Sequence, residues 1–221
     1  MASQQKAPKA PNLILAKEAY GMNTEEQFRN QLRLYFNQLD AMNQQLLTGS
    51  GGHNIDFPHI AAYSNLDQYA TATDTPTKVT WTAATDVSGF TLNVDNTATA
   101  TYDGTYKIEY RLQAVNTDNT TSHNAVVWMQ IDGVNLANST TVFTLPSAPS
   151  AVTPTYKSLN AFITWEAVAG QSVALYWATN KAAVSGGSNG VYLEYEGAQT
   201  TPYAHPEVPS SYGVIQYIGR E

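Results

Sequence analysis

The chain has 221 residues, of which 43% are hydrophobic and 13% are charged, about half of the usual charged share of roughly 25%. Neutral polar residues replace the missing charge, and 26 of them are threonines. A chain of this composition can bury a core, which excludes global disorder. It contains no cysteine, which excludes a disulfide framework, a thiolate zinc site and a cysteine nucleophile.

The net charge of −7 is unevenly distributed along the chain. Residues 1–52 carry a charge of +1, whereas residues 53–221 carry −8. The larger part therefore repels a phosphate backbone, which excludes nucleic acid as a partner. The first residues lack the apolar core of a signal peptide, and no apolar run is long enough to span a bilayer. We therefore expect a protein that is made in a cytoplasm and is not inserted into a membrane.

The N-terminal quarter of the sequence predicts three segments. Residues 1–23 predict a flexible arm, which is polar over residues 1–12 and contains the short apolar stretch Leu13-Ile14-Leu15. Thr24, followed three residues later by Gln27, is typical of a capping box, so a helix is predicted over 24–48. The glycine-rich residues 49–56 predict a hinge after this helix.

Apolar residues recur in this helix at alternating steps of four and three, which is a heptad seam. The seam consists of Phe28, Leu32, Tyr35, Leu39, Met42 and Leu46. The residues that flank the seam carry no pattern of charges that would select a different chain as partner, so the sequence favours a parallel bundle of identical helices. Leu34, Phe36 and Leu47 lie off the seam, which leaves open docking on another protein or packing within the chain. An isolated helix of this length is marginal in water, so we expect a partner.

From residue 53 onward the hydrophobic period changes to two, which is typical of β-strands. Within 105–113, Tyr106, Ile108, Tyr110 and Leu112 share one side of the strand, which predicts one buried face and one hydrated face. Strands are predicted over 58–64, 77–82, 89–94, 97–102, 105–115, 124–132, 139–144, 157–168, 172–180, 190–195 and 212–218. The fold class is therefore all-β, an antiparallel sandwich over 57–221 preceded by one amphipathic helix. Asp103-Gly104 predicts a hairpin between the fourth and fifth strands, and Asp132-Gly133 is a second candidate.

Three of the predicted strands are apolar on both sides, namely 125–131, 161–165 and 173–178. The second side of a strand in an antiparallel sandwich normally meets water. These strands therefore predict a further layer over their sheet, and another copy of the chain is the simplest cover. A deep central position under large loops is the alternative.

The order of several short motifs resembles the jelly roll of the tumour necrosis factor superfamily, including the complement globular heads, over about residues 57–219. The motifs are Gly104-Thr105-Tyr106-Lys107-Ile108, Trp128-Met129-Gln130-Ile131-Asp132-Gly133, Gly170-Gln171-Ser172-Val173-Ala174-Leu175 and Tyr212-Gly213-Val214-Ile215-Gln216-Tyr217-Ile218. Gly170-Gln171 departs from that family, which often has Gly-Asp there. The resemblance implies a homotrimer with aromatic residues around a threefold axis. The candidate interface or core aromatics are Tyr106, Tyr110, Trp128, Phe162, Trp165, Tyr176, Trp177 and Tyr217.

A second resemblance covers about residues 12–48. The segment Leu32-Arg33-Leu34-Tyr35-Phe36-Asn37-Gln38-Leu39-Asp40 is similar to the start of structural proteins of marine podoviruses, especially those infecting cyanobacteria. It implies a common attachment segment that carries an exchangeable head. We therefore expect a virion protein that contacts other virion proteins through residues 1–48, as a capsid decoration or as a tail or fibre component.

Carboxylates and histidines were weighed as catalytic or metal-binding groups. Glu194 and Glu196 have the spacing of a glycosidase pair, but a solvated strand face explains them more simply. The histidines show no ligand spacing: His53, His59, His123 and His205. We expect no enzyme, no catalytic residue, no metal site and no cofactor. Bound calcium at the turns 95–96 and 118–119 stays open.

Sugar binding is the main alternative function, because the chain has 14 tyrosines and 4 tryptophans beside many amides. It would make the protein a host-glycan receptor-binding head, and a glycan hydrolase is the third alternative. The candidate glycan contacts in loops or on outer faces are Tyr63, Tyr69, Tyr156, Tyr192 and Tyr203.

Overall fold

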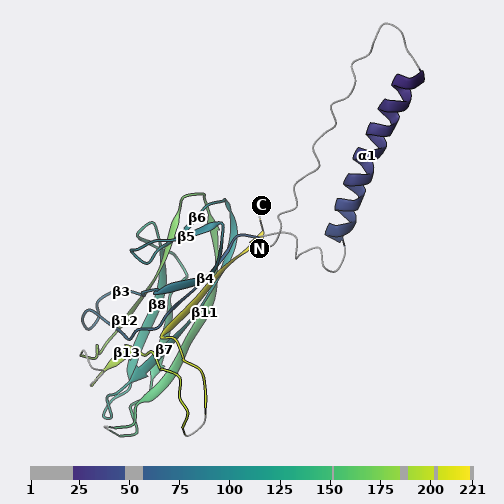
Figure 1. The fold of residues 1–221 in the computed structure, drawn as a ribbon. Coiled ribbons are helices and arrows are strands. Elements are labelled where there is room, and N and C mark those ends of the chain that lie inside the picture. The colour runs from purple at the N-terminus through teal and green to yellow at the C-terminus, as the bar shows by residue number, and fades with distance from the viewer. Residues whose placement is uncertain (1–21, 48–56, 151, 185–188, 202–203, 220–221) are drawn as a thin grey trace. The chain divides into compact units, whose positions relative to one another are not determined.

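A computed structural model describes residues 22–47, 57–150, 152–184, 189–201 and 204–219 (Figure 1). The chain divides into two units, residues 1–56 and residues 57–221, and each is described by itself. The predicted arm lies outside the described residues except for its last two positions, and the predicted hinge at 49–56 lies wholly outside them. Among the described residues, no helix combines the length and the hydropathy needed to span a bilayer.

Helix α1 (Met22–Leu47) begins two residues before the predicted start. Glu25 in its first turn favours the positive end of the helix dipole and accepts a hydrogen bond from Arg29 one turn later, at 2.5 Å. The described seam side chains are all half-buried: Phe28, Leu32, Tyr35, Leu39 and Met42. Off the seam, Leu34 and Phe36 are 61% and 59% exposed. The side chain of Leu46 lies outside the described residues.

The second unit consists of two antiparallel sheets, which confirms the predicted all-β sandwich. The first sheet has the order β2-β13-β7-β14-β1-β4, and β11 pairs with the other edge of β7. Its strands are β1 (His59–Ser64), β2 (Gln68–Tyr69), β4 (Ala83–Ser88), β7 (Gly104–Asn116), β11 (Thr155–Ala167), β13 (Val191–Leu193) and β14 (Ser211–Gly219).

The second sheet has the order β10-β8-β12-β6-β5, with β3 paired to β12 and β9 paired to β8. Its strands are β3 (Thr77–Lys78), β5 (Phe90–Leu92), β6 (Ala98–Ala100), β8 (His123–Ile131), β9 (Val134–Asn135), β10 (Thr141–Leu145) and β12 (Ser172–Thr179). The sequence pattern missed β2, β4 and β9. Two of these have only two residues each, and β4 carries no clear alternation.

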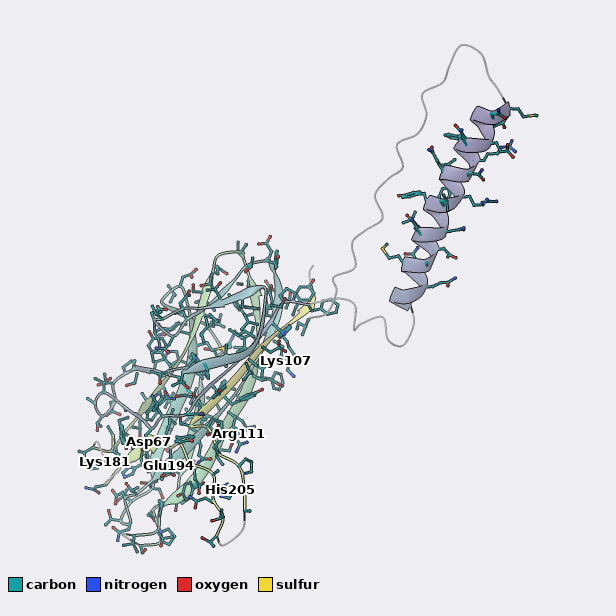
Figure 2. The ribbon with its side chains drawn as sticks, viewed as in Figure 1. Asp67, Lys107, Arg111, Lys181, Glu194 and His205 are labelled. Atoms are coloured by element: carbon teal, nitrogen blue, oxygen red, sulfur yellow. The ribbon has the colours of Figure 1, made fainter. Side chains whose placement is uncertain are left out.

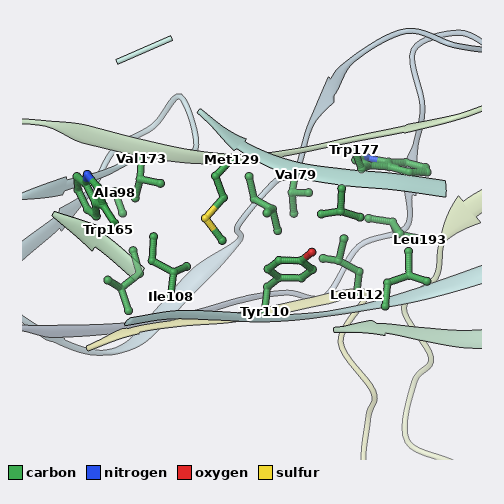
Figure 3. Packing of buried hydrophobic residues seen from close by; sticks show 14 of the residues in the cluster. Val79, Ala98, Ile108, Tyr110, Leu112, Met129, Trp165, Val173, Trp177 and Leu193 are labelled. Atoms are coloured by element: carbon green, nitrogen blue, oxygen red, sulfur yellow. The ribbon is translucent and has the colours of Figure 1, made fainter. Parts of the chain in front are cut away.

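The core lies between the two sheets and is built from the inward side chains of the long strands. Ile108, Tyr110 and Leu112 of β7 are buried, as the alternation of this strand predicts. Figure 3 shows them facing Met129 and Trp177 of the second sheet. Burial stabilises each such large side chain by roughly 1.5–3 kcal/mol, so this layer holds the sandwich together.

The predicted hairpin at Asp103-Gly104 is wrong, because β6 and β7 belong to different sheets. Both edges of β7 are already paired, one with β11 and the other with β14 and β13. The chain instead crosses from one layer to the other at this point. Gly104 is needed for a close approach, since a Cβ there would lie 2.6 Å from the Tyr217 ring.

The turn at Asp132-Gly133 joins β8 to β9 as a hairpin, which confirms the second candidate. Both residues have positive φ angles, 48° for Asp132 and 80° for Gly133. This combination is the one that a two-residue type I′ turn requires.

The strands that are apolar on both sides do not lie in one sheet, so the predicted single covering layer is wrong. Strand β11 is at the edge of the first sheet, whereas β8 and β12 are neighbours in the second. Their second sides therefore face opposite outer surfaces of the sandwich. Alternation of burial also shows that β11 has an ordinary polar outer side with two exposed aromatic exceptions, Tyr156 and Phe162.

Candidate functional sites on the two sheets

The outer face of the first sheet exposes large apolar side chains. Phe162 on β11 is 69% exposed, and Tyr212 and Ile218 on β14 are 41% and 51% exposed. The register places Phe162 level with Glu109 of β7 and Val214 of β14. The shallow hollow on this face is lined by Glu109, Tyr110, Arg111, Asn160, Ala161, Phe162, Tyr212 and Val214. Such a surface differs from the hydrated outer face that an antiparallel sheet usually has.

Charged groups stand beside these apolar side chains. The Lys107 amine forms an ion pair with Glu109 and lies 5.3 Å from the centroid of the Phe162 ring. Arg111 projects from the same strand, as Figure 2 shows, and is exposed. Its guanidinium forms no ion pair with any residue that the structure describes. It is therefore available to a carboxylate of a partner.

The structure separates the eight aromatic residues that were predicted for a trimer interface or the core. Those buried in the core are Tyr106, Tyr110, Trp165 and Trp177. Tyr217 packs against this core and stacks on Phe57 at 5.9 Å. Phe162 alone lies on the outer face of the first sheet. Trp128 and Tyr176 lie on the outer face of the second sheet.

Three of the five candidate glycan tyrosines come together at one end of the first sheet. Tyr156, Tyr192 and Tyr69 occupy one row across β11, β7, β13 and β2. The rings of Tyr69 and Tyr192 stack at 5.2 Å. The Tyr192 hydroxyl donates to Oε1 of Glu194 at 2.7 Å. Tyr63 lies elsewhere, on β1, and Tyr203 lies outside the described residues.

Glu194 interacts with two of these tyrosines. Burial, and then the charge of Glu194, raise the pKa of Tyr156 to about 12. Burial and the hydrogen bond to Glu194 raise the pKa of Tyr192 well above its ordinary value. The hydrogen bond from the Tyr192 hydroxyl holds the carboxylate at the end of β13, and the negative charge of this carboxylate acts on Tyr156 of β11.

The prediction that Tyr192 lies on a solvated strand face with Glu194 and Glu196 is wrong. Tyr192 is only 6% exposed, because Tyr69 and Ala183 cover it. Strand β13 ends at Leu193, so both glutamates follow the strand. Oε1 of Glu196 lies 3.7 Å from Nε2 of His205, so Glu196 pairs with this histidine and does not face Glu194.

The turns that were considered for calcium use their carboxylates internally. Asp95 accepts hydrogen bonds from the Thr97 hydroxyl and from Lys78, and the Thr97 bond is the main cause that lowers the pKa of Asp95. Asp118 accepts bonds from Thr120 and from His123, whose Nε2 lies 2.9 Å from Oδ2. No group of three or more histidine or acidic residues that could hold a metal ion occurs in the described part of the chain.

A second hollow lies on the outer face of the second sheet, and the sequence pattern missed it. It is lined by Lys78, Asp95, Thr97, Gln130, Asp132, Gly133, Ser172, Ala174 and Tyr176. Trp128 stacks on Tyr176 across β8 and β12, with ring centroids 5.9 Å apart. Both rings were assigned to an interface or the core, because their strands are apolar on both sides. The polar residues Asn124 and Gln130, which share one side of β8 with Trp128, are the signal that could have placed that ring outside.

No model of a known protein family matches this chain, and no curated protein is similar to it.

Proposed function

We propose that this protein is a structural protein of a bacteriophage virion. It would be a homotrimer with a jelly-roll domain, and its N-terminal arm and helix would attach it to the particle. Residues 57–221 would project outward from the particle, and residues 1–48 would contact other virion proteins. Capsid decoration and a tail or fibre position both need a trimer, an anchor and a hydrated outer surface. The role is structural and involves no catalysis.

The order of the strands supports the jelly-roll part of the proposal. Four strands of the first sheet run β1-β14-β7-β11, and four of the second run β6-β12-β8-β10. Along the chain, β7, β11 and β14 of the first sheet alternate with strands of the second. Two antiparallel sheets of four main strands, linked by crossings between them, are typical of a jelly roll.

The observation that carries the trimer is the apolar outer face of the first sheet. Three large side chains whose surface is mainly apolar are exposed there, namely Phe162, Tyr212 and Ile218. Burial stabilises such a side chain by roughly 1.5–3 kcal/mol, and a symmetric assembly buries the same set in every copy. Arg111 beside them supplies a charge that can pair with Glu109 of another copy.

The N-terminal unit supports the anchoring role. Residues 1–56 form a unit distinct from the sandwich, and α1 has its half-buried apolar side chains along one stripe. A single helix of 26 residues gains little stability from its own hydrogen bonds, so a helix of this kind is stabilised by packing. A parallel bundle with the other copies and a groove on a neighbouring virion protein would each provide that packing.

Light scattering on the full chain tests the trimer. We expect a mass three times the 24.0 kDa of one chain at micromolar concentration. Phe162→Glu places a charge in the proposed interface, so we expect the mass to fall towards that of one chain.

Val142→Glu is the matched control, because Val142 also projects from a strand and is 62% exposed, but lies on β10 of the second sheet. It should leave the mass unchanged. A monomeric parent protein, or a Phe162→Glu protein that remains trimeric, would show that the first sheet is not the interface.

A further inference from the structure

We infer that the hollow on the outer face of the second sheet binds a neutral saccharide, with Tyr176 against the sugar ring. The hollow has a volume of about 290 Å³. This is just below the range of roughly 300–1,000 Å³ that is common for ligand sites, a size that suits one or two sugar residues. The site belongs to the second sheet, so the inference does not depend on the proposed trimer.

The apolar part of the site is the Tyr176 ring, which forms a strip of two aromatic rings with Trp128. The two residues are paired across β8 and β12, their ring planes are inclined by only 24°, and their centroids are 5.9 Å apart. Tyr176 lines the hollow, and Trp128 stacks beside it. The C–H groups on one face of a pyranose ring pack against such surfaces.

The amide groups beside this strip are held in fixed positions. Asn135 Oδ1 accepts hydrogen bonds from Trp128 Nε1 and Gln130 Nε2, each at 2.9 Å. The second of these bonds orients the Gln130 amide, and Oε1 of Gln130 has no partner among the described residues. A fixed acceptor at the rim of a hollow costs little ordering entropy when a ligand binds.

The opposite wall supplies charged donors and acceptors. Lys78 Nζ donates to the Asp95 carbonyl at 3.0 Å and lies 5.9 Å from the Tyr176 ring centroid. Asp132 Oδ1 accepts from the Ser172 backbone N–H at 2.8 Å, and Oδ2 has no partner among the described residues. Donors and acceptors thus surround the rings on two sides.

A sugar matches this combination because each hydroxyl group donates one hydrogen bond and accepts two. The charges of the lining residues decide between neutral and acidic sugars. Lys78 is already paired with Asp95, which leaves Asp132 as an unbalanced negative charge. A sialic acid, uronate or phosphate group would meet repulsion there, so the ligand class is neutral.

The test uses the full chain and neutral oligosaccharides of glucose, galactose, mannose and N-acetylglucosamine, with sialylated and sulfated glycans for comparison. After a screen on immobilised glycans, affinity is measured by titration in solution. We expect binding of at least one neutral glycan, and a loss of about tenfold or more in affinity for Tyr176→Ala, which removes one ring of the strip. Preference for an acidic glycan, or binding of none, would overturn the inference.

Tyr102→Ala is the matched control, because Tyr102 is a tyrosine of residues 57–221 that is 58% exposed and does not line the hollow. It should bind like the parent. If Tyr176→Ala does not fold, Gln130→Ala removes the oriented amide from a half-exposed position and should weaken binding, while the Gln130 side-chain amide resonances of the parent should shift when sugar is added. Parent-like affinity in the folded Tyr176→Ala or Gln130→Ala protein, or unmoved Gln130 amide resonances, would contradict the inference.

Discussion

Asp118 has both carboxylate oxygens bonded within its own loop. Oδ1 accepts from the backbone N–H and the hydroxyl of Thr120, and Oδ2 accepts from His123. The Thr120 hydroxyl, followed by His123, holds the pKa of Asp118 far below its ordinary value. The ionised carboxylate is therefore the form that stabilises this end of β8.

Asp118→Asn should lower the midpoint temperature of thermal unfolding. The pH dependence of the difference in midpoint between parent and variant tests whether the charge of Asp118 causes it. A depressed folded-state pKa means that the stabilisation is complete above the unfolded carboxyl pKa of about 3.9 and is lost as the pH falls towards the folded value. We expect the difference between parent and variant to be present at pH 5 and to shrink progressively as the pH falls below about 4. Calorimetry across this range measures the difference.

Asp86→Asn is the control for that series, since the Asp86 side chain is 75% exposed and pairs with His59 at the surface. Exposed pairs contribute little to stability, so the control should unfold like the parent throughout. A difference between Asp118→Asn and the parent that does not change with pH would refute the electrostatic explanation.

At the scale of elements, Gly104 fixes where β7 begins. A Cβ at this position would lie 2.6 Å from Cε2 of Tyr217. The Tyr217 ring cannot move freely, because it stacks on Phe57 at 5.9 Å and meets the edge of Tyr106 at 5.7 Å. Gly104→Ala should therefore lower the free energy of unfolding by about 1–3 kcal/mol, as overpacking does. Urea unfolding measures this change.

Gly197→Ala is the matched control, since no atom lies within 4 Å of a Cβ built there. It should change the unfolding midpoint little. Equal effects of the two alanines would mean that the Tyr217 ring yields and that the close approach has no cost.

Patterns within a single strand predicted which side of that strand is buried. They did not predict which strands pair with each other. Alternation placed Tyr110 and Leu112 of β7 inward, because the period of two is a property of a single strand. The dipeptide Asp103-Gly104 looks like Asp132-Gly133, but only the second closes a hairpin. The difference lies in residues far along the chain, since β11 and β14 occupy the edges of β7 that β6 would need.

The candidate sites show the same division. Tyr156, Tyr192 and Glu194 could be named from the sequence, but their meeting across β7 depends on the register of three strands. The apolar neighbours of Trp128 and Tyr176 predict that both rings lie at an interface or in the core. Two-sided apolar strands indicate only that both sides avoid full hydration, and a stacked aromatic pair on an outer face satisfies that as well.

For the whole molecule, the two sheets present chemically different outer surfaces. The first exposes Phe162 and Tyr212 around a shallow hollow, while the second holds a polar hollow over Tyr176. One surface cannot serve both for self-association and for ligand binding, because a surface that is buried between copies of the chain is closed to a ligand. Their placement on opposite sheets would let one protein carry out both roles.

Removal of residues 1–48 separates assembly from attachment. The trimer interface proposed on the first sheet lies within residues 57–221, so the shortened chain should remain folded and keep three times its own mass in light scattering. Supplied in trans during infection, it should be absent from purified particles, whereas the full chain should be present. Leu39→Asp on the helix seam should mimic the deletion, because a charge there opposes packing, while Leu34→Asp, at a position that is 61% exposed, should be incorporated normally. Particles that still contain the shortened chain would show that attachment uses the sandwich, and loss of its trimeric mass would show that α1 holds the copies together.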